Sequence, residues 1–127
     1  MRRTLITALV VLIISIALCV ASTCAVGVAV KRADDLRLQA EHAAKLGDRA
    51  GALKQVLAMS ESWQSASRWL ELMTSHDTLS DVRVAIEDAR ICLENNERAE
   101  FLRASEAVAA ALERLRATEA LRLMNLF

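Results

Sequence analysis

An uninterrupted apolar run over residues 4–30 constrains the fold of this chain more than any other feature. The run contains no charged residue and no proline, and its first half consists mainly of Leu, Ile and Val. As a helix rising about 1.5 Å per residue it would reach roughly 40 Å, against a hydrocarbon core of about 30 Å. We therefore predict that residues 1–30 form an N-terminal transmembrane anchor and that residues 31–127 form a soluble domain.

The same run shares features with a secretory signal peptide. Arg2 and Arg3 precede it, and small residues such as Thr23 and Ala25 could flank a cleavage site. A signal core is typically about 7–15 residues long, so the length of the run favours an uncleaved anchor. The basic residues on the two flanks are nearly balanced, and the short arginine-bearing N-terminus favours the cytoplasmic side. The predicted location is the cell membrane, crossed once, with the soluble domain outside the cytoplasm.

The composition beyond the anchor predicts an all-α domain. The chain has 127 residues, no Pro and three Gly, and it is rich in Ala, Leu, Glu and Arg, which favour helices. Its formal net charge is zero and it lacks a basic, aromatic-interleaved surface, so nucleic acid is excluded as an expected partner. Of the three Cys, only Cys92 lies outside the apolar run, so no disulfide framework can form. A buried free thiol is the simplest interpretation of Cys92, with a cross-chain disulfide or a reactive thiol as alternatives.

Helical periodicity continues past the anchor and predicts a small antiparallel bundle of three to four helices. The transmembrane helix is expected to continue without a break to Leu46. There Gly47 supplies a C-terminal cap and Asp48 an N-cap for a second helix that ends near Thr74. Two further helices are predicted over residues 79–93 and from residue 97 onward.

Several apolar residues have predicted positions relative to the core. Leu57 and Trp63 fall on the inner stripe of the second helix, whereas Trp69 projects beside it and either covers the core edge or contacts a partner. The apolar tail, residues 121–127, loses the helical period and is expected to fold back onto the bundle. If it does not, its end at Leu126 and Phe127 is the best candidate for a docking peptide.

The order of these sequence features along the chain resembles the order found in one known family. The shared marks are the apolar anchor, the Gly47-Asp48 break, Trp63, the His76-Asp77 pair, a further pair of helices, and an ending with Glu119 and Asn125-Leu126-Phe127. This chain is similar to the family catalogued as domain of unknown function 4363, small membrane-anchored helical proteins of Gram-positive, spore-forming bacteria. The resemblance implies an architecture and no reaction.

His76 and Asp77 are the strongest candidates for a catalytic metal site, because adjacent His and Asp residues bind metal in phosphohydrolases. A stable zinc site needs three or four ligands, and the only other histidine is His42. A structural role is favoured, in which Asp77 caps the third helix and His76 bonds locally in the turn. No catalysis, metal or cofactor is expected, and a metal-dependent hydrolase using this pair stays as a lesser alternative.

Small residues recur every four positions along one side of the apolar run and beyond it: Ala17, Ala21, Ala25, Ala29 and Ala33. Such spacing lets two membrane helices approach closely, so this ladder is a candidate face for self-association or for binding a protein partner. The sequence as a whole predicts a single-pass membrane protein that presents a helical bundle as an interaction or scaffold module. Its partners would be the lipid bilayer and a protein. The alternative is an extracytoplasmic, ligand-binding sensor-like bundle.

Overall fold

The chain folds into four helices, in a computed structural model that describes residues 1–72 and 74–126. They are α1 (Arg2–Lys45), α2 (Arg49–Leu70), α3 (His76–Glu94) and α4 (Arg98–Leu126). The described residues contain no strand. The predicted all-α class is therefore confirmed, with four helices in the bundle.

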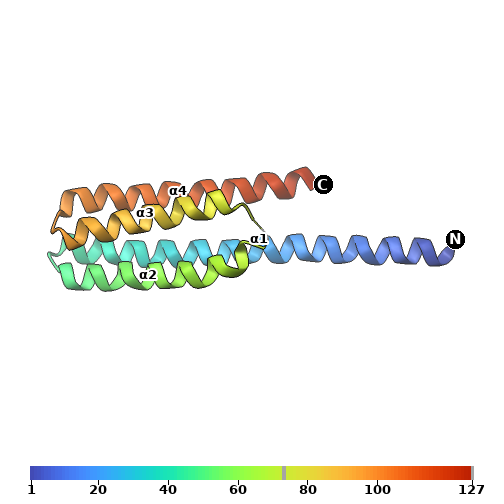
Figure 1. The fold of residues 1–127 in the computed structure, drawn as a ribbon, viewed down its shortest axis with the longest axis horizontal. Coiled ribbons are helices and arrows are strands. Elements are labelled where there is room, and N and C mark those ends of the chain that lie inside the picture. Colours follow the sequence, from blue (N-terminus) through green and yellow to red (C-terminus); the bar gives the residue numbers. More distant parts are fainter. Residues whose placement is uncertain (73, 127) are drawn as a thin grey trace.

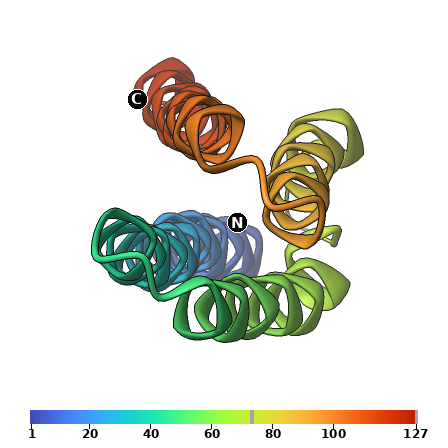
Figure 2. The same ribbon diagram turned by 90° about the vertical axis from the view of Figure 1, so that its left-hand side faces the viewer.

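The helices run alternately in opposite directions and pack as a bundle. Each helix contacts its neighbours in sequence, and α4 also contacts α1, which closes the ring. Figure 2 shows the four helices at the corners of the bundle, and Figure 1 shows them lengthwise. At one end, here called the turn end, lie the α1–α2 and α3–α4 connections. At the other, here called the open end, α2 and α3 stop while α1 and α4 run on (Figure 1).

Two turns of the same kind close the turn end. Gly47 has a φ of +79°, and the N–H of Asp48 donates to the carbonyl of Ala43 at 2.9 Å, which is the Schellman arrangement. Asp48 then caps α2 by accepting from the N–H of Gly51 at 2.9 Å. The predicted Gly-Asp break is confirmed. Asn96, with a φ of 56°, takes the same left-handed position after α3.

An arginine joins these two turns. The Arg49 Nε donates to the carbonyl of Leu93, and its Nη2 to that of Glu94, both at 2.6 Å. These carbonyls belong to the last turn of α3, where a helix leaves acceptors unpaired and favours positive charge. The first turn of α2 is thereby fixed to the last turn of α3.

The connection between α2 and α3 lies three to four residues earlier in the chain than predicted. α2 ends at Leu70 rather than near Thr74, and α3 begins at His76 rather than near Leu79. Ser75, not Asp77, occupies the N-cap position, and its side chain makes no capping hydrogen bond. Asp77 lies in the first turn instead, where its charge is favourable against the positive end of the helix dipole.

The four inner faces form one continuous core. Its largest fully buried apolar members come from all four helices: Val26 on α1; Val56, Met59, Trp63 and Leu70 on α2; Val82 and Ile86 on α3; and Phe101, Val108 and Leu115 on α4. Trp63 also donates from Nε1 to the carbonyl of Leu79 at 3.3 Å, which ties α2 to α3. Leu57 is 44% exposed, so its predicted inward position is wrong.

α1 is one unbroken helix with two different environments. Residues 1–21 are exposed apart from the half-buried Cys19, whereas from Ser22 onward a buried residue recurs every three or four positions. Val26 and Val30 belong to the bundle core. The inner face of residues 22–30, assigned to the anchor from hydropathy, is thus packed against the other helices.

The apolar end of the chain continues α4 and is not a separate tail. α4 remains helical to Leu126, so residues 121–126 extend the helix, and the expectation that they form a separate segment folded back onto the bundle is wrong. Leu, Arg and Met favour helix there, and α4 lies beside α1 (Figure 1). Leu121 and Met124 are exposed, and Leu123 is half-buried.

Candidate functional site

The helices separate the two histidines that sequence analysis considered for a metal site. His42 lies near the turn end of α1 and His76 at the open end, a distance of about the length of α2, roughly 33 Å. The His76 side chain is 77% exposed, and its Nδ1 lies 3.4 Å from Oε1 of Glu71. Within residues 1–72 and 74–126, no three His, Cys, Asp or Glu side chains converge on a common point. A shared site for His42 and His76 is therefore not formed in this fold.

The alanine ladder is divided between the two parts of α1. Ala33 is buried in the bundle core, and Ala25 and Ala29 are half-buried against it. Ala17 and Ala21 are exposed on the part of the helix that leaves the bundle. Association through this face stays a prediction, and the residues free for it are Ala17 and Ala21.

Two of the three predicted partner contacts, Trp69 and the backbone of Leu126, lie towards the open end. Trp69 is 47% exposed in the last turn of α2. The backbone of Leu126 ends α4, and Phe127 lies outside the described residues. Partner binding by these three residues stays a prediction.

Cys92 is a half-buried thiol on α3. Burial, followed by the nearby carboxylates of Glu97, Glu100 and Asp88, raises the pKa of this thiol above its ordinary value. Both effects disfavour the negatively charged thiolate, which is the reactive form. The surroundings of Cys92 therefore lower the fraction of the thiol that is present as the reactive thiolate.

We expect Cys92 to be alkylated slowly. In a variant with Cys19→Ala and Cys24→Ala, the rate of reaction with iodoacetamide should rise with pH along a curve displaced to higher pH than that of N-acetylcysteine amide. Unfolding the protein in denaturant should remove the displacement, because both causes depend on the fold. Equal rates for the folded and unfolded protein would contradict this assignment.

Two oppositely charged side chains, Arg37 and Glu41, are buried between α1 and α4. Arg37 is 8% exposed and donates to Asp34 Oδ1 at 2.8 Å and to Glu41 Oε1 at 3.0 Å. Ser105 of α4 donates its hydroxyl to the same Glu41 oxygen at 2.7 Å. The polar atoms of Arg37 and Glu41 are thus paired with one another and with α4, which indicates a structural role for this network.

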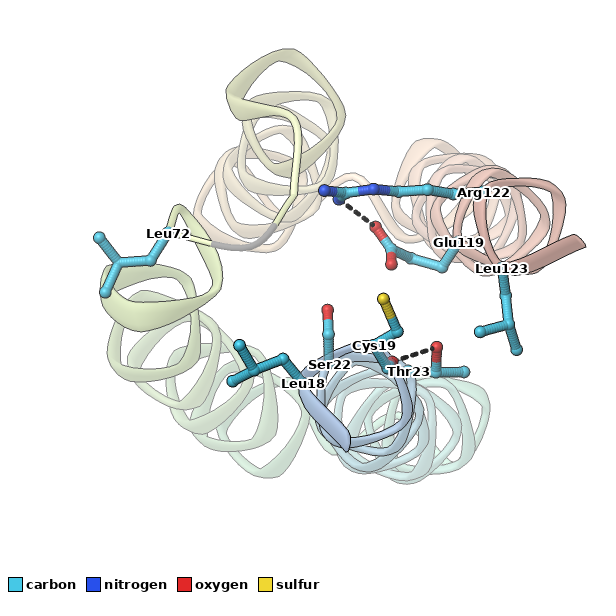
Figure 3. Close-up of a pocket in the computed structure, with 8 residues that line it drawn as sticks. All are labelled: Leu18, Cys19, Ser22, Thr23, Leu72, Glu119, Arg122 and Leu123. Atoms are coloured by element: carbon cyan, nitrogen blue, oxygen red, sulfur yellow. Dashed lines mark hydrogen bonds and ion pairs between the residues drawn. The ribbon is translucent and has the colours of Figure 1, made fainter. Parts of the chain in front are cut away.

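A second polar cluster lies at the open end and is incompletely paired. A pocket of about 340 Å³ lies there between α1, α4 and the end of α2, and its lining residues are Leu18, Cys19, Ser22, Thr23, Leu72, Glu119, Arg122 and Leu123. In Figure 3, Cys19, Ser22, Glu119 and Arg122 point into the space enclosed by the helices. This pocket is the candidate site.

Glu119 is the distinctive group of the pocket. It is 4% exposed, and its Oε1 has no hydrogen-bond partner among the described residues. Arg122 Nη1 lies 3.8 Å from that oxygen, close enough for attraction but beyond hydrogen-bond distance. A buried carboxylate oxygen without a hydrogen bond is costly, and it marks a position where a donor from outside could bind.

Glu119 is predicted from the sequence only as a feature shared with the family, and its buried position on α4 was not predicted. The signal was present, because the buried positions of α4 recur at helical spacing: 101, 105, 108, 111, 112, 115 and 119. A carboxylate at an inward position breaks the apolar pattern, and such a break identifies a buried polar group.

The fold and the exposed part of α1 together define a class of protein. It is an all-helical chain in which one N-terminal helix continues into a four-helix bundle. Among the described residues, α1 is the one helix long and apolar enough to cross a membrane, and none of its most apolar stretch is buried.

The comparison with known families agrees with this class. The family model described as "Domain of unknown function (DUF4363)" matches residues 29–126, and the chain belongs to this family. The family resemblance drawn from the sequence is thereby confirmed. The matched range covers most of the bundle and omits the whole exposed apolar part of α1, residues 1–21. No curated protein and no solved structure matches the chain.

Proposed function

We propose that this protein is a single-pass membrane protein whose four-helix bundle serves as an interaction or scaffold module. The observation that carries the proposal is the continuity of α1. Its first part is apolar on all sides and exposed, and its second part is one of the four walls of the bundle. A helix that is apolar all round and not covered by protein suits a lipid environment.

The length of the exposed part supports this assignment. Residues 4–21 span roughly 27 Å as a helix, close to the hydrocarbon thickness of about 30 Å. Because no loop separates anchor from bundle, the bundle would stand at a fixed angle on the membrane. We infer that the N-terminus lies inside the cell and the bundle outside the cytoplasm, as the arginine-bearing N-terminus favours.

The proposal assigns no reaction to the chain and predicts a bound protein or a second copy. Crosslinking of the full chain in its native membranes, followed by identification of the linked peptides, tests it. We expect links from α1 or from the region around Trp69 to one defined partner. A chain that remains monomeric and unlinked would contradict the proposed role as an interaction or scaffold module.

We expect the exposed part of the alanine ladder to contribute to that contact. Replacing Ala17 and Ala21 by Leu should weaken a membrane two-hybrid signal, because larger side chains keep two helices from approaching closely. Ala8→Leu with Ser15→Leu is the matched control, since both positions lie nearly opposite on the helix and are also exposed. Equal signals for the two double variants would exclude this face.

One observation favours a second function, the binding of a ligand by the bundle. The pocket at the open end combines a buried carboxylate oxygen without a hydrogen bond with apolar walls, as ligand sites commonly do.

A further inference from the structure

The pocket at the open end lies where α2 and α3 stop and α1 and α4 continue. Leu18 and Thr23 line it from α1, and Glu119 and Leu123 from α4. About 20 helical residues cross a hydrocarbon core of about 30 Å, so a span that starts at Thr4 ends near Thr23. The pocket would therefore lie at the boundary between lipid tails and headgroups. This placement rests on the proposed membrane anchor.

The polar groups of the pocket are mainly hydrogen-bond acceptors, so they suit a ligand that donates hydrogen bonds. Glu119 Oε1 is buried and accepts none from the described residues. Ser22 directs its oxygen towards the same space (Figure 3). Thr23 donates its hydroxyl hydrogen to the carbonyl of Cys19 at 3.0 Å, so its own oxygen lone pairs remain acceptors. An ammonium group, with several N–H donors and a positive charge, suits this set of acceptors.

The remaining walls suit the rest of a phospholipid. The Arg122 guanidinium lines the pocket next to Glu119, which places a cation where a headgroup phosphate would follow the ammonium group. Leu18 and Leu123 line the same pocket, and the exposed side chains of α1 continue from it as an apolar surface. A volume of about 340 Å³ is at the small end of ligand sites and suits a headgroup rather than a whole lipid.

We propose that this pocket binds the headgroup of an aminophospholipid of the ethanolamine type. Glu119 accepts a hydrogen bond from the primary ammonium group, Arg122 lies beside the phosphate, and the acyl chains follow the apolar surface of α1. Phosphatidylcholine has the same charges but no N–H donor, so it should bind more weakly. Phosphatidylglycerol lacks the cation altogether.

Native mass spectrometry of the full chain released from lipid nanodiscs tests this proposal. Nanodiscs are prepared with phosphatidylethanolamine, phosphatidylcholine or phosphatidylglycerol of identical acyl chains, and retained lipid is counted. We expect one phosphatidylethanolamine per chain, retained about tenfold better than phosphatidylcholine, as expected for a hydrogen bond to a charged group. Glu119→Gln keeps the shape of the side chain and should abolish this preference. Glu113→Gln, exposed on the same helix, should not.

Each contrary outcome has a distinct meaning. Equal retention of the three lipids, or a preference unchanged by Glu119→Gln, overturns the headgroup site while leaving the anchor intact. If soluble phosphoethanolamine at an equal concentration displaces the lipid, the pocket recognises the free headgroup. That result overturns the proposal that a membrane lipid supplies the ammonium group. Failure of the wild-type chain to enter nanodiscs of any composition overturns the anchor, and the site with it.

Discussion

Replacing Trp63 by Ala is expected to destabilise the bundle more than any other single truncation on α2. Trp63 is 2% exposed and is among the largest fully buried side chains. Its removal eliminates a large area of core contact and the 3.3 Å hydrogen bond to the carbonyl of Leu79. Truncation of a buried aromatic residue to Ala costs about 3–5 kcal/mol. For a domain of this size, that corresponds to a Tm lowered by roughly 12 °C or more.

The chain provides its own control for this measurement. Trp69 is on the same helix and is 47% exposed, so Trp69→Ala should change the unfolding free energy little. Thermal unfolding of the full chain in detergent, followed by far-ultraviolet circular dichroism, compares the two variants. Trp63→Phe retains much of the volume and should lie between them, because it loses the hydrogen bond and part of the ring. Similar Tm values for Trp63→Ala and Trp69→Ala would refute the assignment of Trp63 to the core.

The local chemistry of the chain was sufficient to predict the helices and one turn. Gly47 followed by Asp48 predicts a left-handed cap and an N-cap, and both are present. The inner stripe of α4 was equally clear, because apolar residues such as Phe101 and Val108 recur at helical spacing. These features depend on residues close in sequence, so no tertiary information was needed.

The extent of the bundle along α1 could not be predicted from hydropathy. Val26 and Val30 are apolar, as both lipid and a protein core require, and composition alone does not separate the two environments. The length of the partner helices decides which part of α1 packs in the bundle and which part stays exposed. α4 continues to Leu126, and its last turns lie beside the part of α1 around Ser22. That pairing depends on contacts between opposite ends of the chain.

The polar core groups were missed for a related reason. Arg37, Glu41 and Glu119 occupy inward positions, although charged residues usually mark the solvated face of a helix. A periodicity analysis that counts only apolar residues omits them. Their burial follows from the pairing of α1 with α4, where Ser105 and Arg122 provide partners or near neighbours.

Arg37→Met should destabilise the bundle nearly as much as the loss of Trp63. Arg37 holds the carboxylate of Glu41, which is 9% exposed, with one hydrogen bond of 3.0 Å. Met fills a similar volume but leaves that carboxylate buried with Ser105 as its remaining partner. Removing one member of a buried ion pair costs about 3–5 kcal/mol, because the other charge stays buried without compensation. Chemical denaturation of the full chain in detergent measures the loss.

A second triad with the same spacing is the matched control, because it lies at the surface. Arg90 pairs with Glu87 and Glu94, three residues before and four after it, each at 2.6 Å. Asp34 and Glu41 stand in the same relation to Arg37. Exposed pairs contribute little because water and salt screen them, so Arg90→Met should have a much smaller effect than Arg37→Met.

The double variant Arg37→Met with Glu41→Leu separates burial of charge from loss of packing. It removes both charges and fills the space with apolar groups, which in other buried pairs is neutral or stabilising. We therefore expect it to be more stable than Arg37→Met alone, with a coupling of roughly 2 kcal/mol or more between the two positions. If the two losses instead add, the pairing of Arg37 with Glu41 contributes nothing to the fold. In that case the cost of Arg37→Met would come from its contact with Asp34 and from packing against α4.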